Sequence, residues 1–256
     1  MIDPRAVVST DAALGEGVSV GAFSVIGPQV TIGARTRIEP HAMIGGPTRI
    51  GADNHIFSFA AIGGPPQDKK YRGEPTRLEI GDRNVFRESC TMNRGTAGGT
   101  GVTRIGDDNL FMAYSHVAHD CQIGNQTVFA NCASLAGHVE VGDWVIIGGL
   151  SAVHQFAKIG AHAFLGGGTI LSRDVPPYVM VNGNPALPHT VNAEGLKRRG
   201  FSEEQIRVIR DAYRILYRSE LKLTDAVARL EQLAQAHDVI RPFVDFIHGS
   251  TRSLVR

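Results

Sequence analysis

The chain has 256 residues, which is enough for one large domain or for one domain with a small second one. Its 43% hydrophobic and 20% charged residues are typical of a soluble globular protein, and its net charge of +1 gives no global attraction to nucleic acid or to a membrane surface. No apolar window predicts a signal peptide or membrane insertion, and three cysteines without a CxxC pair favour a reducing, cytoplasmic location.

An aliphatic residue recurs at every sixth position from Ile2 to Ile62, and again, with two phenylalanines, from Ile105 to Leu171. A glycine often follows it directly. A period of six fits neither a helix nor one long strand. It indicates a short strand and a tight turn, repeated, so that three repeats close a triangular coil and successive coils stack about 4.8 Å apart. We therefore predict a mainly β protein, a parallel β-helix of hexapeptide repeats.

Two segments interrupt this pattern. Residues 64–77 (GPPQDKKYRGEPTR) are charged and rich in proline, but Ile62 and Ile80 remain eighteen residues apart, so we expect the chain to complete one coil between them. Residues 94–103 (RGTAGGTGVT) shift the period by one residue. We predict that both are external loops on a rigid stack, where binding and catalytic residues are often found.

The repeat ends after Leu171, and a segment with several prolines follows it. Ser202 and Gln205 then form a capping box at the start of an amphipathic helix. Two more helices are expected, one from Thr224 and one over about 239–248. The predicted organisation is a β-helix over residues 1–184 and a small C-terminal α-helical domain over residues 185–256.

Residues eighteen apart in the second unbroken run stack on the same face of the prism. The columns of interest are His119, Gly137 and Gln155; Asp120 and His138; and Asn131, Gly149 and Gly167. Four histidines therefore fall near one side of three neighbouring coils, namely His116, His119, His138 and His154.

This cluster predicts a general base, because imidazole titrates near neutral pH. Asp120 is placed to fix the tautomer of His119, and the Gly137 N–H is placed to stabilise an oxyanion. Two alternatives remain open: a structural ladder of polar side chains, and a zinc site shared between subunits.

A basic stripe starts at residues 197–199 and continues along the first long helix. Its later members are Arg207, Arg210, Arg214 and Arg218. The stripe is consistent with a solvated helix face, or with a contact for a phosphate or an acidic protein partner.

Several motifs together resemble the UDP-N-acetylglucosamine acyltransferases of lipid A biosynthesis. They are PPQDKKYRGEPTRLEIGDRN, HVAHDCQIGNQTVFANCASLAGHVEVGD, the following IIGG and VHQF, DVPPYV, and VNAEGLKRRGFS. The resemblance covers the whole chain. It implies a left-handed β-helix, a homotrimer with active sites between subunits, and no cofactor or metal. The implied reaction transfers a 3-hydroxyacyl chain from acyl carrier protein to the 3-hydroxyl of UDP-N-acetylglucosamine, the first step of lipid A biosynthesis.

The resemblance also implies individual roles. His119 matches the general base, Asp120 its orienting partner and Gly137 the oxyanion donor. The matching substrate contacts are Gln67, Asp68 and Lys70 in the first loop, His116, His138 and His154 in the cleft, Gln155, Asn192, Glu194, Arg198 and Arg199 for the nucleotide, and Gly167 at the end of the acyl channel. Asn93 departs from the histidine of many relatives, and it cannot become a cation. The rival functions are a hexapeptide acyltransferase that uses another acceptor or acyl-CoA, and a purely structural β-helix.

Overall fold

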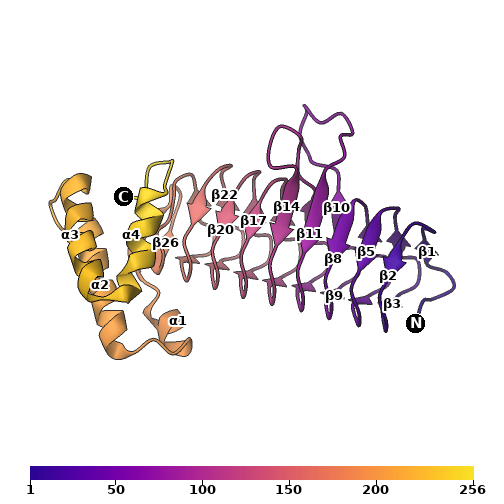
Figure 1. The fold of residues 1–256 in the computed structure, drawn as a ribbon, viewed down its shortest axis with the longest axis horizontal. Coiled ribbons are helices and arrows are strands. Elements are labelled where there is room, and N and C mark those ends of the chain that lie inside the picture. Colours follow the sequence, from indigo (N-terminus) through magenta and orange to yellow (C-terminus); the bar gives the residue numbers. More distant parts are fainter.

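The computed structural model describes residues 1–256 as a three-sided prism of stacked coils with helices packed at its C-terminal end (Figure 1). Each coil gives one short strand to each of three sheets, and neighbouring strands pair in parallel except in one terminal hairpin. The predicted β-helix with a following helical region is therefore confirmed. No helix is both long and apolar enough to cross a membrane.

The three sheets form the faces of the prism. The nine-stranded sheet contains β1 (Val7–Val8), β4 (Val25–Ile26), β7 (Met43–Ile44), β10 (Ala61–Gly64), β13 (Thr91–Asn93), β16 (His116–Val117), β19 (Ser134–Leu135), β22 (Ala152–Val153) and β25 (Ile170–Leu171). The eight-stranded sheet contains β2 (Ala13–Leu14), β5 (Val30–Ile32), β8 (Thr48–Ile50), β11 (Arg77–Ile80), β14 (Val102–Ile105), β17 (Gln122–Ile123), β20 (Glu140–Val141) and β23 (Lys158–Ile159). The ten-stranded sheet contains β3 (Ser19–Val20), β6 (Arg37–Ile38), β9 (His55–Ile56), β12 (Val85–Phe86), β15 (Leu110–Phe111), β18 (Val128–Phe129), β21 (Ile146–Ile147), β24 (Phe164–Leu165), β26 (Val179–Asn182) and β27 (Leu187–Val191).

The hexapeptide repeat builds the core of the prism. The second residue of each two-residue strand points inward, and in the middle coils it is buried, as for Ile44 and Val117. Phe86, Phe111 and Phe129 stack in one column, with ring centroids 5.0 and 4.7 Å apart. Each such buried side chain contributes about 1.5–3 kcal/mol through removal of apolar surface from water. Because every coil stacks only on its neighbours, the core is a continuous column of inward side chains.

The expectation that one coil joins Ile62 to Ile80 is wrong. Ile80 pairs with Ile50, and Ile62 pairs with Met92, so each of these pairs spans thirty residues. The loop after β10 therefore adds twelve residues to a coil of eighteen. Twelve is two repeats, which keeps the six-residue period in phase although the next strand belongs to a different sheet. The second interruption behaves as predicted, because Ile105 pairs with Ile80 at a separation of twenty-five residues.

The chain turns at three edges of the prism, which we name by their residues. The loop edge joins the nine- to the eight-stranded sheet and carries residues 65–76, 94–101 and 118–121. The asparagine edge joins the eight- to the ten-stranded sheet and contains Asn54, Asn84 and Asn109. The apolar edge joins the ten- to the nine-stranded sheet and exposes Phe59 and Leu150.

The segment after Leu171 is more ordered than its prolines indicate, because β26 and β27 extend the ten-stranded sheet as an antiparallel hairpin. The expected division at residue 184 falls in the turn of this hairpin. The helices that follow are α1 (Ala193–Arg198), α2 (Glu203–Tyr217), α3 (Leu223–Ala236) and α4 (Arg241–His248). The capping box of Ser202 and Gln205 is present at α2. The short helix α1 was not predicted.

Candidate active site

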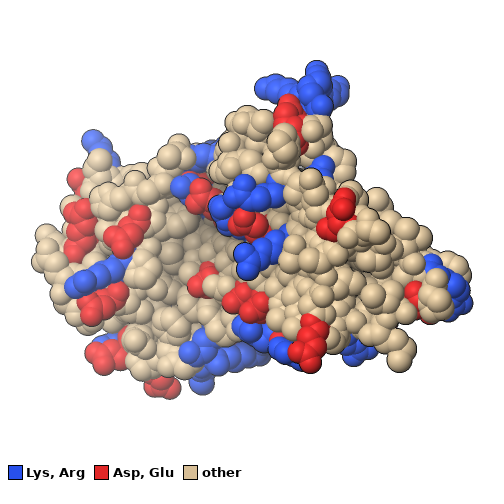
Figure 2. Space-filling model, turned by 45° about the vertical axis from the view of Figure 1, so that its right-hand side comes forward, with Lys and Arg blue, Asp and Glu red and all other residues tan.

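Both loops and the histidine corner lie together on the loop edge. Figure 1 shows the loops projecting from the prism between β10 and β14. Backbone hydrogen bonds tie them to each other: the Arg94 N–H donates to Gly64 O at 3.0 Å, and the Arg77 N–H donates to Gly101 O at 3.0 Å. The projecting tip of the first loop carries cationic side chains (Figure 2), which come from the KKYR segment, residues 69–72. The two interruptions therefore form one structure beside the corner at Asp120.

The turn after β16 presents His119 and Asp120 side by side. His119 Nδ1 lies 2.9 Å from Asp120 Oδ2, and the Asp120 side chain is fully buried while that of His119 is 16% exposed. Asp120 adopts the left-handed conformation with φ 61° and donates its backbone N–H to Thr103 Oγ1. This contact places the Nδ1 proton between the two residues, so Nε2 carries the lone pair, and Nε2 makes no hydrogen bond within the chain. The predicted base and its orienting partner are brought together.

The second loop surrounds the Asp120 carboxylate. Thr96 donates from its backbone N–H and from Oγ1, the latter at 2.6 Å to Oδ2, and the Thr100 N–H donates to Oδ1 at 2.9 Å. Burial by itself raises the pKa of Asp120, but the hydrogen bonds from Thr96 and His119 outweigh it and hold the pKa below its ordinary value. Asp120 is therefore an anion at neutral pH.

Two other predicted histidines complete this region. His138 packs edge-on against His119 with ring centroids 5.0 Å apart, and its Nε2 lies 3.9 Å from Asp120 Oδ2. His116 lies on the nine-stranded face, where its Nδ1 is 2.7 Å from Thr91 Oγ1. Burial lowers the pKa of both imidazoles, so both are neutral at pH 7.

Gly137 lies one coil above the base, as the column argument predicted. A Cβ atom at Gly137 would come within 2.5 Å of His119 Cε1, so only glycine fits beside the imidazole. Its N–H makes no hydrogen bond within the chain. The N–H is therefore available to an oxyanion near His119.

A depression of about 460 Å³ lies between the loops and the histidine corner. Its lining includes Asp68, Lys70, Tyr71 and His138, together with the segment 96–100. Phe156 stacks on His138 with ring centroids 4.4 Å apart and forms one wall. The depression therefore lies between the two loops and His138, next to the dyad, although neither His119 nor Asp120 lines it.

The zinc alternative can be weighed from the same geometry. His119, Asp120 and His138 offer ligand atoms within 4.8 Å of one another. However, the Asp120 oxygens already accept hydrogen bonds from Thr96, Thr100 and His119. The donor set therefore favours an oriented base over a metal centre.

Other predicted residues on this side make fewer contacts with the dyad. Gln67 is exposed in the first loop and does not line the depression. His154 and Gln155 are exposed one coil beyond Gly137. Asn93 is buried and donates from Nδ2 to Pro65 O at 3.0 Å, so in this chain it anchors the start of the first loop.

The predicted nucleotide contacts of α1 lie on a different edge. Asn192 caps α1 through Gly195 N and donates from Nδ2 to His162 O, so both ends of its amide are used within the chain. Glu194 and Arg198 are exposed on the helix. This group lies at the asparagine edge, across the eight-stranded face from His119.

Arg199 is held against two rings that the sequence did not single out. Its guanidinium lies 5.1 Å from the centroid of Trp144 and donates to His162 Nδ1 at 3.2 Å. Burial and the neighbouring Arg199 lower the pKa of His162 to about 4, so this imidazole stays neutral and accepts the hydrogen bond. Burial also lowers the pKa of Arg199. Trp144 and His162 are eighteen residues apart and stack as one column of the repeat, whereas only the tertiary fold brings Arg199 to them.

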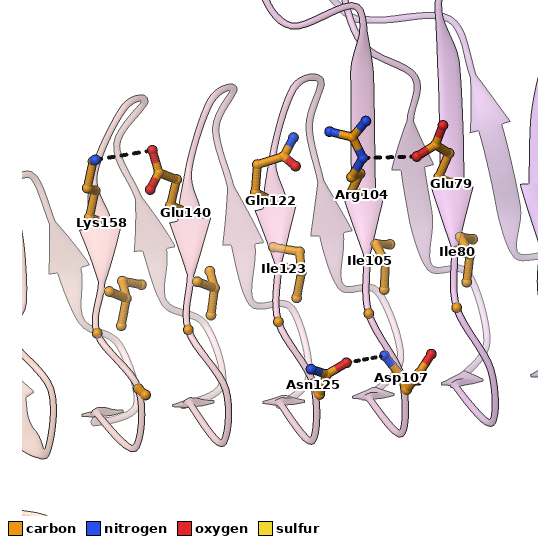
Figure 3. Close-up of a pocket in the computed structure, with 18 of the residues that line it drawn as sticks. Glu79, Ile80, Arg104, Ile105, Asp107, Gln122, Ile123, Asn125, Glu140 and Lys158 are labelled. Carbon is orange, nitrogen blue, oxygen red and sulfur yellow. Dashed lines mark hydrogen bonds and ion pairs between the residues drawn. The ribbon is translucent and has the colours of Figure 1, made fainter. Parts of the chain in front are cut away.

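A trough of about 990 Å³ lies on the eight-stranded face. Figure 2 shows this hollow bordered by side chains of both signs, and Figure 3 shows the row of side chains along it. Arg104 pairs with Glu79 at 2.9 Å, and Lys158 pairs with Glu140 at 3.3 Å. None of the predicted site residues lines the trough. Because the trough contains none of the predicted site residues and four of its charged side chains pair with each other, we assign the chemistry to the loop edge.

Comparisons with known proteins bear on this site. A family model described as "Udp N-acetylglucosamine O-acyltransferase; Domain 2" matches residues 174–255, and one for six bacterial transferase hexapeptide repeats matches residues 11–46 and 103–137. Acyl-[acyl-carrier-protein]–UDP-N-acetylglucosamine O-acyltransferases of Halorhodospira halophila and Thiobacillus denitrificans are 57% and 52% identical to the chain. Each alignment covers 100% of this chain and 99% of the relative. The chain belongs to this family of O-acyltransferases.

Solved structures of UDP-N-acetylglucosamine acyltransferases have the same fold. That of Francisella novicida is 40% identical with a TM-score of 0.98, and covers 100% of this chain and 94% of its own. That of Moraxella catarrhalis is 42% identical with a TM-score of 0.96, and covers 100% and 99%. The family resemblance inferred from the sequence motifs is therefore confirmed.

Proposed function

We propose that the protein transfers a 3-hydroxyacyl group from acyl carrier protein to the 3-hydroxyl of UDP-N-acetylglucosamine, as the first step of lipid A biosynthesis. The observation that carries this proposal is the His119–Asp120 dyad beside the unpaired Gly137 N–H. The dyad supplies a base for the attacking hydroxyl, and the N–H supplies a donor for the charge that develops on the thioester oxygen.

In the proposed reaction the His119 Nε2 lone pair accepts the proton of the sugar 3-hydroxyl as that oxygen attacks the thioester carbonyl. Asp120 stabilises the imidazolium that forms, because it is an anion 2.9 Å from Nδ1. The Gly137 N–H stabilises the tetrahedral oxyanion. Collapse of that intermediate breaks the C–S bond, and the proton held by His119 passes to the leaving thiolate. No covalent acyl-enzyme is needed.

The distribution of apolar side chains supports a homotrimer. On the ten-stranded face the outward positions of five successive coils are Val85, Leu110, Val128, Ile146 and Phe164. The apolar edge exposes Phe23, Phe59, Tyr114 and Leu150 by 53–73%, and the next face exposes Val7, Val25, Met43 and Ile170. The eight-stranded face instead carries charged pairs. Two faces and the edge between them therefore suit burial against further copies of the chain.

This packing would complete the site. Contact between two different faces of identical chains is heterologous, and it forms a closed ring when the rotation between copies closes, as a rotation of one third of a turn does for three copies. When the ten-stranded face of one copy packs on the nine-stranded face of the next, the asparagine edge of the first meets the loop edge of the second. Arg199 of one copy then lies beside the dyad of its neighbour, at a level about two coils, or about 10 Å, further along the prism axis. A sugar nucleotide is long enough to bridge that distance.

The proposal is tested by incubating the protein with UDP-N-acetylglucosamine and a 3-hydroxyacyl carrier protein and measuring the O-acylated nucleotide sugar. Parallel reactions replace the donor with 3-hydroxyacyl-CoA, or the acceptor with N-acetylglucosamine 1-phosphate. Preferred transfer between the first pair supports the proposal. Preferred use of either substitute would support the rival acyltransferase, and no transfer in any reaction would support a structural β-helix. Sedimentation equilibrium tests the trimer separately.

A further inference from the structure

The segment 95–101 of the second loop has no role in the proposed chemistry, yet it supplies most of the contacts to Asp120. We propose that Thr96 is a positioning residue for the reaction, which acts by fixing the carboxylate of Asp120 and, through it, the imidazole of His119. The proposal rests on the proposed function of the His119–Asp120 dyad.

Thr96 makes the closest of these contacts. Its Oγ1 donates to Asp120 Oδ2 at 2.6 Å, and the same carboxylate oxygen is 2.9 Å from His119 Nδ1. One oxygen atom is thus held from both sides, by the threonine hydroxyl and by the imidazole. Thr96 and Asp120 are both buried, so water does not replace the hydroxyl if it is removed.

The backbone of the segment is shaped around the carboxylate. A Cβ atom at Gly99 would come within 2.5 Å of Asp120 Cγ, so the chain passes directly over the carboxyl group. The N–H groups of Gly99 and Gly101 both donate to Thr96 O at 3.1 Å and hold the turn closed. Thr100 contributes its N–H, while its hydroxyl also reaches Val102 O and is shared between two acceptors. The Thr96 hydroxyl therefore donates to Asp120 alone, whereas the Thr100 hydroxyl is shared with Val102 O.

The contact reaches across the sequence. Thr96 and Asp120 are twenty-four residues apart, because the second loop folds back over the next coil. The carboxylate belongs to a residue of the coil, and the loop covers it from outside the prism. A carboxylate that keeps one position gives the His119 ring one orientation, and a small displacement of a general base costs a large part of its rate.

The test compares three variants with the parent protein in steady-state assays against both substrates. Thr96→Val keeps the shape of the side chain and removes the hydroxyl, Thr96→Ser keeps the hydroxyl, and Thr127→Val is the matched control. Thr127 is also buried, and its Oγ1 donates at 2.6 Å to Asn109 on the asparagine edge. We expect Thr96→Val to lower kcat about tenfold with little change in either KM, which corresponds to about 1.4 kcal/mol of transition-state stabilisation.

Thr96→Ser should recover most of kcat, and Thr127→Val should lower the unfolding temperature without changing kcat. The proposal is overturned if Thr96→Val keeps the parent kcat, if Thr96→Ser is as slow as Thr96→Val, or if Thr127→Val loses as much turnover. If Thr96→Val does not fold, Thr96→Ala removes the hydroxyl without adding bulk, and its kcat relative to Thr96→Ser decides the question.

A measurement without substrate separates this proposal from the proposed function. In histidine-selective ¹⁵N NMR, the Nδ1–H signal of His119 should shift or broaden in Thr96→Val and stay unchanged in Thr127→Val. An inactive parent protein contradicts the proposed function, whereas the NMR comparison still reports whether Thr96 holds the dyad. An unchanged His119 signal in Thr96→Val contradicts the positioning role.

Discussion

The loop edge and the asparagine edge are built from the same repeat but use polar side chains in opposite ways. At the asparagine edge, Asn54 Oδ1 accepts from Asn84 N and Nδ2, and Asn84 Oδ1 accepts from Asn109 N and Nδ2. Each of these amides also donates to a backbone carbonyl. All their hydrogen-bonding capacity is consumed inside the chain, so the ladder stabilises the prism and has nothing left for a ligand.

At the loop edge only the buried groups use their full hydrogen-bonding capacity within the chain. Asp120 is buried and fully bonded, whereas His119 is partly exposed and keeps Nε2 free, and the Gly137 N–H is unpaired. The buried, hydrogen-bonded Asp120 carboxylate thus supports a partly exposed imidazole whose Nε2 is free to accept a hydrogen bond. The two edges differ in the residues at the corner and in the inserted loops, because at the loop edge the second loop covers the Asp120 carboxylate and a depression lies beside it. Substitutions at the two edges test this contrast, and substitutions on the apolar edge and in the helical domain extend it to the rest of the proposed site.

The largest effect is expected from removal of the base. His119→Ala should lower kcat/KM by at least ~10²-fold, because general-base catalysis contributes about 10²–10⁴-fold. The unfolding temperature should change little, since the side chain adds no packing to the core. Steady-state kinetics and thermal unfolding on the same preparation check both points. Activity within about threefold of the parent would show that the base lies elsewhere.

The converse substitution is Asn84→Ala at the asparagine edge. It removes donors and acceptors from buried neighbours, and a buried polar group without a partner costs about 1–3 kcal/mol. We expect a loss of that size in urea unfolding at fixed protein concentration, with kcat unchanged. The exposed Asn125 of the same edge is the matched control, and Asn125→Ala should cost less. A fall in kcat for Asn84→Ala would break the division between the two edges.

The apolar edge provides a third case, in which an absent side chain is the functional feature. A Cβ atom at Gly167 meets only Gly149 O, at 3.5 Å, so there is room for a side chain there. Gly167→Met should fill the end of the proposed acyl channel and shift preference toward shorter 3-hydroxyacyl donors. Each methylene contributes about 0.8 kcal/mol, which is about fourfold in selectivity. Competition between long and short donors measures the shift, and equal losses for all donors would reduce Gly167 to a structural glycine.

The smallest effect is expected from substitutions in the helical domain. Four exposed arginines lie on one side of α2 and its C-terminal cap, namely Arg207, Arg210, Arg214 and Arg218. Two of them pair with acidic residues of the same helix, Arg207 with Glu204 at 3.9 Å and Arg214 with Asp211 at 3.0 Å. Acyl carrier protein is acidic, so reversal of Arg210 and Arg214 to Glu should raise KM for the acyl donor a few-fold more than KM for UDP-N-acetylglucosamine. Added salt should reduce the difference between the parent and variant KM values for the acyl donor, because it screens the attraction between the arginines and acyl carrier protein. Equal changes in both KM values would argue against docking at this surface.

The sequence by itself determined the prism, because the six-residue period specifies which side chains point inward in every coil. It also placed His119, Asp120 and Gly137 together, since the run from Ile105 to Leu171 is unbroken and residues eighteen apart must stack. The capping box of Ser202 and Gln205 could also be predicted, because its two residues are only three positions apart. Each of these conclusions depends on a period or on neighbours in sequence.

Only the tertiary structure decided the rest. The first loop adds two whole repeats, so the period could not show that Ile80 stacks on Ile50 instead of following Ile62 by one coil. No periodicity relates Thr96 to Asp120, or Arg199 to Trp144 and His162, because an irregular loop or a helical domain carries one partner of each pair. A repeat fixes contacts at constant separation, whereas the path of an insertion depends on the hydrogen bonds it finds on the finished stack. That is why the grouping of His119, Asp120 and Gly137 could be predicted from the sequence, but the residues that hold Asp120 and Arg199 in place could not.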